Sequence, residues 1–251
     1  MKTTIRIGAL ACIACLPLSV IAQDKEQEET YIYATYLMCD TSMQEQADNT
    51  VDTDYTPIYD QAVEDGAITG WGWMAHHTGG KWRRILYHTA SSMEELLSGM
   101  ETVGQMRDEK MGDSDGVSKA CRSHDDYIWR SVAGCGRGVL TAPRGKVGLS
   151  AYHVCKISKE SRADELLKAV FAPVYDAHVG PGKLSSWGWS EHIVGGKYRR
   201  LATMTAEDWP TLLKMRESIF SELEDNELGD EFVEICGSHS DYLWEIRHAS
   251  P

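Results

Sequence analysis

The sequence predicts an α+β fold made of two tandem ferredoxin-like modules, each a βαββαβ unit. Two observations carry this prediction. A Trp-Gly-Trp motif followed by Gly-Gly-Lys and Arg-Arg occurs twice in the chain. Strand-like and helix-like runs also follow one another in the same order around both motifs, and that order is the split βαβ pattern. Self-similarity at a fixed spacing indicates repeated structural units.

The two copies align without a gap over most of their length. Trp71 and Trp187 are 116 residues apart, and the same offset relates residues upstream and downstream of the motif. The offset becomes 115 near the end of each copy, where Cys121 corresponds to Cys236. Further matched pairs are Tyr36/Tyr152, Cys39/Cys155, Pro57/Pro173, Gly66/Gly182, His76/His192, Arg83/Arg199, His124/His239 and Asp126/Asp241.

Each copy begins with a run suited to a strand, over residues 31–39 and 149–155. A helical region follows, clearest over 162–170, where apolar residues keep a helical spacing. Pro57 and Pro173 kink this region or start a second short helix. Gly66 and Gly182 are then expected to close it, because glycine favours the position just past a helix end.

Gly79-Gly80 and Gly195-Gly196 each separate two strand-like runs, which predicts a β-hairpin with a two-residue turn. Counting outwards from such a turn fixes the register of its strands. This register places His76 opposite Arg83 and His192 opposite Arg199. It places Trp73 and Trp189 on the other face of their hairpins. A second helix (92–103, 207–219) and a final strand (126–132, 241–247) complete each copy.

The cysteines give a test of this topology. In a ferredoxin-like module the first and last strands are antiparallel neighbours, so a cysteine ending the first and one preceding the last lie at the same end. Export permits disulfides. We therefore predict the disulfides Cys39–Cys121 and Cys155–Cys236, with Cys135 unpaired. Four buried thiols are the alternative, because free cysteine is readily buried.

The chain divides into a signal peptide (1–22), an acidic leader (23–30), a first module (31–133), a Gly/Pro linker (134–147) and a second module (148–251). Lys2 and Arg6 precede an apolar run and a Val-Ile-Ala cleavage site, which is typical of a secretory signal. An uncleaved anchor and a lipoprotein are the alternatives. We expect a secreted or periplasmic protein with no membrane segment after cleavage.

The formal net charge of −13 argues against nucleic-acid and membrane-surface partners, since an acidic chain repels phosphate groups. The simpler explanation of this charge is that it keeps the protein soluble. A small-molecule partner and a homo-oligomer both stay open.

The His/Arg pairs are the first candidate site. A cationic neighbour lowers the pKa of a histidine, and a neutral imidazole beside a guanidinium suits a carboxylate, a phosphate or an enolate. We favour the alternative, in which His76/Arg83 and His192/Arg199 cap the hairpin ends. Trp73 and Trp189 are expected in the core or along an aromatic-binding pocket.

The second candidate cluster contains His124 and His239. Each shares a strand face with an aspartate two residues later, whereas the preceding serine points to the opposite face. Ser/His/Asp hydrolase chemistry is therefore disfavoured. The histidines lack metal-ligand spacing, and no glycine-rich phosphate loop precedes a helix, so we predict no metal site.

In its element order, its Trp-Gly-Trp strand and its Gly-Gly hairpin, the chain resembles the dimeric α/β-barrel superfamily, of which the antibiotic-biosynthesis-monooxygenase-like proteins are a branch. The resemblance covers both copies. It implies that the two modules pack sheet against sheet as an internal dimer. Members include cofactor-free oxygenases, haem-binding enzymes and isomerase-like proteins, but no catalytic motif of theirs transfers to residues here.

Three functions follow as hypotheses. The first is binding of a small molecule in a cavity between sheet and helices, lined by Trp73 or Trp189 and ringed by the His/Arg pairs. The second is an oxygenase-like or haem-handling enzyme with histidine as proton acceptor. The third is a non-catalytic structural protein. The ligand and any cofactor stay unknown at this stage.

Overall fold

The computed structural model describes residues 29–112, 115–135 and 144–250. The predicted signal peptide, most of the acidic leader and part of the linker lie outside the described residues, as does the side chain of Cys135. Within the described ranges, no helix is both long and apolar enough to cross a membrane.

The first half of the described chain runs from β1 to β4. Its strands are β1 (Tyr31–Met38), β2 (Gly70–Thr78), β3 (Arg84–Ala90) and β4 (Ser123–Cys135). Between β1 and β2 lie η1 (Thr41–Met43), α1 (Gln44–Thr50), the π-helical η2 (Val51–Tyr55) and α2 (Thr56–Glu64). Helices α3 (Met93–Met111) and α4 (Gly116–Ala120) connect β3 to β4.

The second half, from β5 to β8, follows the same order. Its strands are β5 (Val147–Val154), β6 (Ser186–Val194), β7 (Arg200–Ala206) and β8 (Ser238–Ala249). Between β5 and β6 lie η4 (Ile157–Lys159), α5 (Glu160–Leu166), the π-helical η5 (Leu167–Phe171) and α6 (Ala172–Ala177). Helices α7 (Trp209–Glu222) and α8 (Glu227–Cys236) connect β7 to β8.

Local signals explain where several helices begin and end. Pro57 and Pro173 stand in the first turns of α2 and α6, so the prolines start helices there. Ser92 caps α3 by accepting a hydrogen bond from the Glu95 amide. Gly66 follows α2 with a φ of 74°, as predicted.

Three expectations about the helices were wrong. Helix α3 continues to Met111 rather than ending at Val103. Helix α6 ends at Ala177, so Gly182 lies in the following turn rather than at the helix end. The short helices α4 and α8, which directly precede Cys121 and end at Cys236, were not predicted. Each begins at a side-chain cap, Asp115 or Asn226. Helix α4 has five residues, too few to show a period, whereas α8 does have helical apolar spacing, at Leu228, Phe232 and Ile235.

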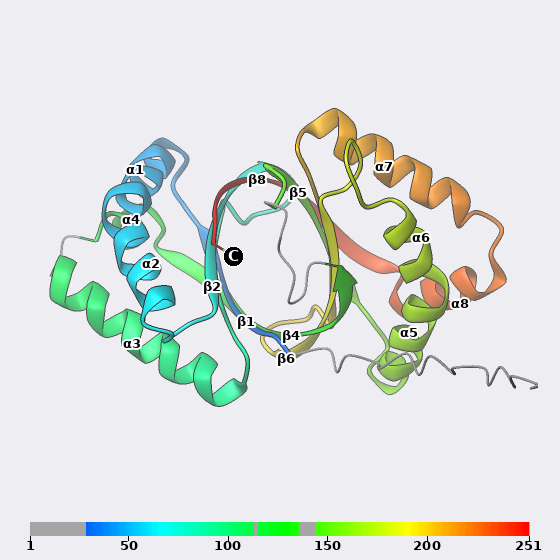
Figure 1. The fold of residues 1–251 in the computed structure, drawn as a ribbon, viewed down its shortest axis with the longest axis horizontal. Coiled ribbons are helices and arrows are strands. Elements are labelled where there is room, and N and C mark those ends of the chain that lie inside the picture. Colours follow the sequence, from blue (N-terminus) through cyan, green and yellow to red (C-terminus); the bar gives the residue numbers. More distant parts are fainter. Residues whose placement is uncertain (1–28, 113–114, 136–143, 251) are drawn as a thin grey trace, which may run out of the picture.

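The eight strands close into one antiparallel barrel in the order β1-β3-β2-β8-β5-β7-β6-β4. Strand β2 pairs with β8, and β4 pairs with β6, so two seams join the halves by backbone hydrogen bonds. The helices of the first half cover one side of the barrel and those of the second half cover the other (Figure 1). Closure leaves no sheet edge unpaired.

Alternation along the strands divides the core into three clusters. Two clusters lie between strands and helices, one in each half, and contain Trp71 and Trp73 or Trp187 and Trp189. The third cluster lies inside the barrel and draws on both halves. It consists of aromatic side chains with a few aliphatic ones, among them Tyr36, Trp82, Trp129, Tyr152, Tyr198 and Trp244.

Both predicted disulfides are present. Strands β1 and β4 are antiparallel neighbours, with Leu37 opposite His124, which brings Cys39 and Cys121 to the same end of the sheet. Strands β5 and β8 place Cys155 beside Cys236 in the same way.

The hairpin register is the predicted one, but the turns are wider than predicted. Gly72 pairs with Tyr87 and Met74 with Ile85, as counting from a two-residue turn requires. Regular pairing nevertheless stops at Ala75 and Arg84. The strands part there because Trp82, in the connection, turns inward and stacks on Tyr242 of the other half at 5.0 Å.

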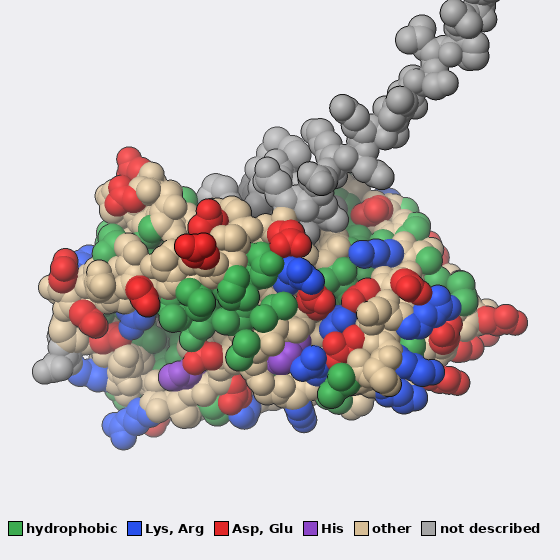
Figure 2. Space-filling view, turned by 90° about the horizontal axis from the view of Figure 1, so that it is seen from below, with side chains coloured by type: hydrophobic (Ala, Val, Ile, Leu, Met, Phe, Trp, Pro, Cys, Tyr) green, Lys and Arg blue, Asp and Glu red, His purple; other side chains and the backbone are tan. Residues whose placement is uncertain are grey.

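Charges of both signs occur together on the face that Figure 2 draws. Figure 2 shows Asp and Glu side chains alternating with Lys and Arg, with hydrophobic side chains gathered near the middle of this face. Interspersed charge of this kind favours solubility over attraction to a polyanion.

Candidate functional site between the sheet and the helices of the first half

The predicted His/Arg pairs form. Arg83 Nη1 lies 3.0 Å from His76 Nε2, and Arg199 Nη1 lies 2.7 Å from His192 Nδ1. His76 stands edge-on to Trp244, with ring centroids 6.0 Å apart. Burial, and then the charge of Arg83, lowers the pKa of His76. The pKa of His192 is lowered by burial and then by Arg199.

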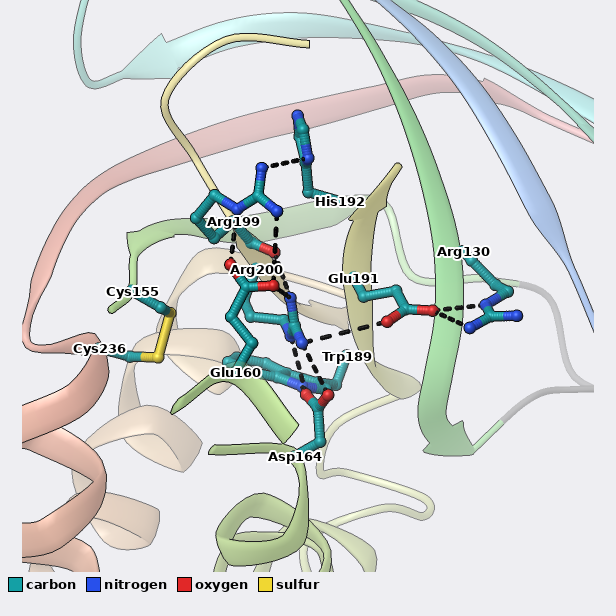
Figure 3. A network of polar contacts seen from close by, with 10 residues as sticks. All are labelled: Arg130, Cys155, Glu160, Asp164, Trp189, Glu191, His192, Arg199, Arg200 and Cys236. Carbon is teal, nitrogen blue, oxygen red and sulfur yellow. Dashed lines mark hydrogen bonds and ion pairs between the residues drawn. A yellow bond between two sulfur atoms is a disulfide. The ribbon is translucent and has the colours of Figure 1, made fainter. Parts of the chain in front are cut away.

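The surroundings of these pairs indicate a structural role. In the second half Glu160 accepts a hydrogen bond of 2.6 Å from Arg199 Nε and also pairs with Arg200, so the cationic charge is balanced (Figure 3). In the first half Arg83 donates to the Gly80 carbonyl at 3.1 Å, which ties the hairpin turn. Neither pair lines the cavities described below. That these pairs ring a ligand cavity stays a prediction.

Trp73 and Trp189 are buried anchors rather than pocket walls. Trp73 Nε1 donates to Asp48 at 2.8 Å, and Asp48 also receives a bidentate contact from Arg84 at 2.6 and 2.7 Å. Trp189 Nε1 donates to Asp164, which holds Arg200 in the same manner (Figure 3). Each tryptophan therefore completes a buried ion pair, which satisfies its only polar atom.

A cavity of about 300 Å³ does lie between sheet and helices, but in the first half and with mostly different residues. Strands β1, β3 and β4 form its floor, and η2, α2, α3 and α4 supply its walls. Of the predicted ligand-binding residues His124 lines it, and so does Cys121 of the predicted disulfide. Its lining also includes Tyr33, Tyr55, Tyr59, His88, Arg107, Val117 and Asp126.

One wall of this cavity is a fixed polar triad. Asp115, the N-cap of α4, accepts hydrogen bonds from the Tyr55 hydroxyl at 2.8 Å and from Arg107 Nη2 at 3.0 Å. The Arg107 guanidinium lies over the Tyr55 ring, 4.4 Å from its centroid. Burial raises the pKa of Asp115, but hydrogen bonds from Ser118 and Tyr55 and the charge of Arg107 outweigh it and lower the pKa overall. Asp115 is thus held as an anion that orients Arg107.

Two buried polar atoms of the cavity residues have no hydrogen-bond partner within the described chain. They are the Nε donor of Arg107 and the Oδ1 acceptor of Asp126. Buried polar atoms are nearly always satisfied, so these two are positions where a bound molecule can supply the partner. They offer it one donor and one acceptor. His192 Nε2, Asp241 Oδ1 and Trp244 Nε1, which line neither of the two cavities described here, also lack a partner within the described chain.

Aromatic and imidazole groups complete the lining. Burial, and then the charge of Asp126, raises the pKa of Tyr33 to about 12, and burial raises the pKa of Tyr55. Burial lowers the pKa of His88 to about 4, so this imidazole is neutral at physiological pH. His124 Nε2 lies 3.1 Å from Asp126 Oδ2, which confirms that these two residues share a strand face.

The second half has no such polar lining at the corresponding positions. By the offset of the repeat, Tyr33, Tyr55, His88 and Arg107 correspond to Leu149, Phe171, Met204 and Leu223. Phe171 packs on Phe232 with ring centroids 4.7 Å apart. His239 still lies near Asp241, at 3.5 Å, but Arg216 also contacts that carboxylate. The same backbone thus carries a polar cavity lining in one half and an apolar core in the other.

Sequence reasoning missed Tyr33, Tyr55, His88 and Arg107 because it considered only residues that both copies keep. The useful signal was the opposite one. Positions that are polar in the first copy and apolar in the second mark this lining, because a core position needs a reason to become polar.

No protein-family model and no curated protein sequence matches the chain. Solved structures share its fold. A candidate monooxygenase from Lactobacillus acidophilus NCFM has a TM-score of 0.56 at 7% identity, covering 89% of this chain and 96% of that one. A candidate monooxygenase from Fusobacterium nucleatum has a TM-score of 0.57 at 6% identity, covering 90% and 95%. A chlorite dismutase from Candidatus Nitrospira defluvii has a TM-score of 0.54 at 8% identity, covering 88% and 91%.

The chain therefore shares the overall fold of these structures, which in this protein is a closed eight-stranded barrel. At these identities the likeness concerns the fold alone.

Proposed function

We propose that the protein is an exported small-molecule-binding protein whose ligand occupies the cavity between sheet and helices of the first half. In this proposal the two halves are ferredoxin-like modules of one chain that replace the two subunits of a dimeric α/β barrel, and only the first keeps a binding site between its sheet and its helices. The observation that carries the proposal is the pair of unpartnered buried atoms, Arg107 Nε and Asp126 Oδ1, in a cavity otherwise lined by aromatic and apolar side chains.

Export is supported by the disulfides Cys39–Cys121 and Cys155–Cys236, because such bonds persist in oxidising compartments. The basic and apolar segment at residues 1–22 agrees with this, since it has the pattern of a secretory signal. Secretion or a periplasmic location is accordingly part of the proposal.

The charges of the cavity disfavour an anionic ligand, and we take a neutral one. The guanidinium of Arg107 is paired with Asp115 behind the lining, the carboxylate of Asp126 lines the cavity, and His88 is neutral. A flat ring system can pack against Tyr33, Tyr59 and His88, which line the cavity. It would carry a carbonyl to accept from Arg107 Nε and a hydroxyl to donate to Asp126 Oδ1.

The experiment uses 6-hydroxy-1-tetralone, a neutral two-ring ketone with one phenolic hydroxyl, in isothermal titration calorimetry. We expect it to bind about tenfold more tightly than 1-tetralone, which lacks the hydroxyl, because a hydrogen bond to a charged group contributes this much. Arg107→Leu, which installs the residue of the second copy, should weaken binding of 6-hydroxy-1-tetralone by a similar factor.

A second variant blocks the cavity. Val117→Phe installs the residue found at the corresponding position, Phe232, and should abolish binding while the protein keeps its circular dichroism spectrum. Arg216→Met is the control. It gives the second half the methionine that the first half has at the equivalent position, Met100, and it should leave binding unchanged. Unaltered affinity in Arg107→Leu and Val117→Phe would contradict the proposal.

An oxygenase-like enzyme is the second candidate, favoured by the His124–Asp126 contact at the cavity and by the names of the similar structures. In this reading His124 accepts the proton of a bound phenol, and Asp126 orients the ring. His124→Gln should then abolish turnover and retain binding of 6-hydroxy-1-tetralone.

The residues present do not fit an axially ligated haem in this cavity. His88 Nε2 lies 3.4 Å from the Leu96 carbonyl, and His124 Nε2 is engaged with Asp126. Neither cavity histidine therefore offers an unengaged Nε2 to iron.

A further inference from the structure

A second cavity, of about 510 Å³, lies inside the barrel, on the opposite side of the sheet from the first cavity. Side chains of β1 to β7 line it, so it draws on both halves. The aromatic cluster of the barrel closes it at the level of Tyr36, Trp129 and Tyr152, which are themselves buried. The barrel that surrounds it stands between the two helical layers (Figure 1).

The two halves contribute partly different chemistry to this barrel cavity. The first half supplies the apolar side chains Ile32, Ala34, Met74 and Ile85 together with the hydroxyl groups of Thr69, Thr89 and Ser131. The second half supplies Leu201 and the hydroxyl groups of Ser150, Ser186, Ser190, Thr203 and Thr205. By the offset of the repeat, Ser150 and Ser190 stand where the first half has Ala34 and Met74. The exchange is thus from apolar to polar at equivalent positions, and Ser150 and Ser190 are buried.

A cation completes the lining. Arg144 Nη1 donates to the Tyr87 hydroxyl at 2.8 Å, and its guanidinium lies 5.8 Å from the centroid of that ring. No carboxylate among the described residues forms an ion pair with Arg144. Glu29 also lines the cavity and contacts Arg130 at 3.4 Å, a guanidinium that it shares with Glu191. Arg144 is thus the cation of this lining that no carboxylate of the described residues engages.

We propose that the barrel cavity is a second ligand site, selective for a hydroxylated ring carboxylate. The carboxylate binds Arg144, one ring face lies against the apolar wall of Ile32 and Ile85, and the ring hydroxyls bond to Thr203 and Ser190. A guanidinium is the side chain best matched to a carboxylate. The site is independent of the cavity of the proposed function, since the two share no lining residue.

The probe is 3,5-dihydroxybenzoate, and its matched neutral partner is 3,5-dihydroxybenzamide. Isothermal titration calorimetry on the full protein should show the carboxylate binding about tenfold more tightly than the amide, because it makes a charged hydrogen bond with Arg144. Arg144→Gln should reduce this difference to within twofold. Lys168→Gln removes the same charge from an exposed helical position and should leave both affinities unchanged.

A filling variant tests the location of the site. Tyr87 lies over Gly72, where any added Cβ would approach the Tyr87 ring to 2.4 Å, and Thr203 stands over Gly188 in the same relation. Tyr87 of the first half is the equivalent of Thr203. A tyrosine introduced by Thr203→Tyr therefore has room over Gly188, and it would fill the barrel cavity. We expect it to abolish binding of 3,5-dihydroxybenzoate while binding of 6-hydroxy-1-tetralone, if present in the unaltered protein, persists.

Ser190→Met, which installs the residue that the first half has at the equivalent position, Met74, is the second filling variant. It is used if near-ultraviolet circular dichroism shows that Thr203→Tyr does not fold. Equal affinity for acid and amide, absence of binding to 3,5-dihydroxybenzoate, or undiminished binding in a folded filling variant would each overturn the proposal. Because the two cavities have different probes and variants, failure of one leaves the other intact.

Discussion

At the scale of single residues, burial without a charged partner defines His88. It is almost fully buried, its Nε2 faces the Leu96 carbonyl, and its ring stacks on Tyr33 at 5.5 Å. Burial lowers its pKa to about 4, whereas the unfolded chain has the ordinary value of about 6.5. The folded protein therefore disfavours protonation of His88. Stability from this group is present above pH 6.5, falls as the pH drops, and is lost below pH 4.

We predict that the unaltered protein loses about 2 kcal/mol more unfolding free energy between pH 7 and pH 5 than His88→Met does. Methionine is the residue at the corresponding position 204, where it is buried, so the variant should fold. Urea unfolding at the two pH values measures the difference. Parallel pH dependence of the two proteins would show that His88 is not held neutral by burial.

At the scale of elements, the double-glycine hairpins serve a purpose beyond the turn. Gly79 has a φ of 135°, and a Cβ there would lie 2.7 Å from the Tyr242 ring. A Cβ on Gly80 would lie 2.3 Å from the Tyr242 hydroxyl. The hairpin of one half thus rests directly on a tyrosine of the other half, and Gly195 and Gly196 repeat the arrangement on Tyr127.

Gly79→Ala should therefore cost about 2 kcal/mol or more of unfolding free energy, from backbone strain plus the displacement of Tyr242. Gly66→Ala is the control, because Gly66 also has a positive φ, 74°, but no heavy atom lies within 4 Å of its added Cβ. It should cost about 1 kcal/mol. Urea denaturation measures both. Equal costs would mean that the glycine is required only by the turn.

The disulfides act at the same scale. Each links the end of a first strand to the start of a last strand, across sequence separations of 82 and 81 residues. Closing loops of this length restricts the unfolded chain, so Cys39→Ala/Cys121→Ala should lower the unfolding free energy by about 2–5 kcal/mol. Urea unfolding measures this loss. Alkylation without reduction, read by mass spectrometry, should leave these four sulfurs unmodified, and their modification would contradict the pairing.

At the scale of the whole molecule, the barrel makes the two halves interdependent. Strand pairs β2–β8 and β4–β6 cross between them, and the aromatic interior mixes side chains of both. Trp244 is an example. It is fully buried, it stacks on Tyr242 with centroids 5.2 Å apart, and it meets His76 of the other half edge-on.

We expect a single cooperative unfolding transition, with fluorescence and far-ultraviolet circular dichroism giving coincident curves. Trp244→Ala should lower the unfolding free energy by about 3–5 kcal/mol, because it leaves a cavity in a core that the halves share. Both curves should move together. Separate transitions for the two probes would instead indicate halves that fold independently.

Sequence by itself determined the internal repeat, the order of strands, the hairpin register and the cysteine partners. These follow from local signals: residue spacing, glycine pairs and the antiparallel first and last strands. It also brought together His124 with Asp126 and each His/Arg pair, since pairing in a strand or hairpin is set by nearby residues.

Only the tertiary structure decided where the cavities lie. Tyr55, Arg107 and Asp126 come from η2, α3 and β4, and no local pattern relates them. It also decided that Trp73 completes a buried ion pair and that Gly79 meets Tyr242 of the other half. The physical reason is that burial and contact depend on what packs opposite a side chain. In a closed barrel the opposite side chain belongs to a distant part of the chain, often to the other half.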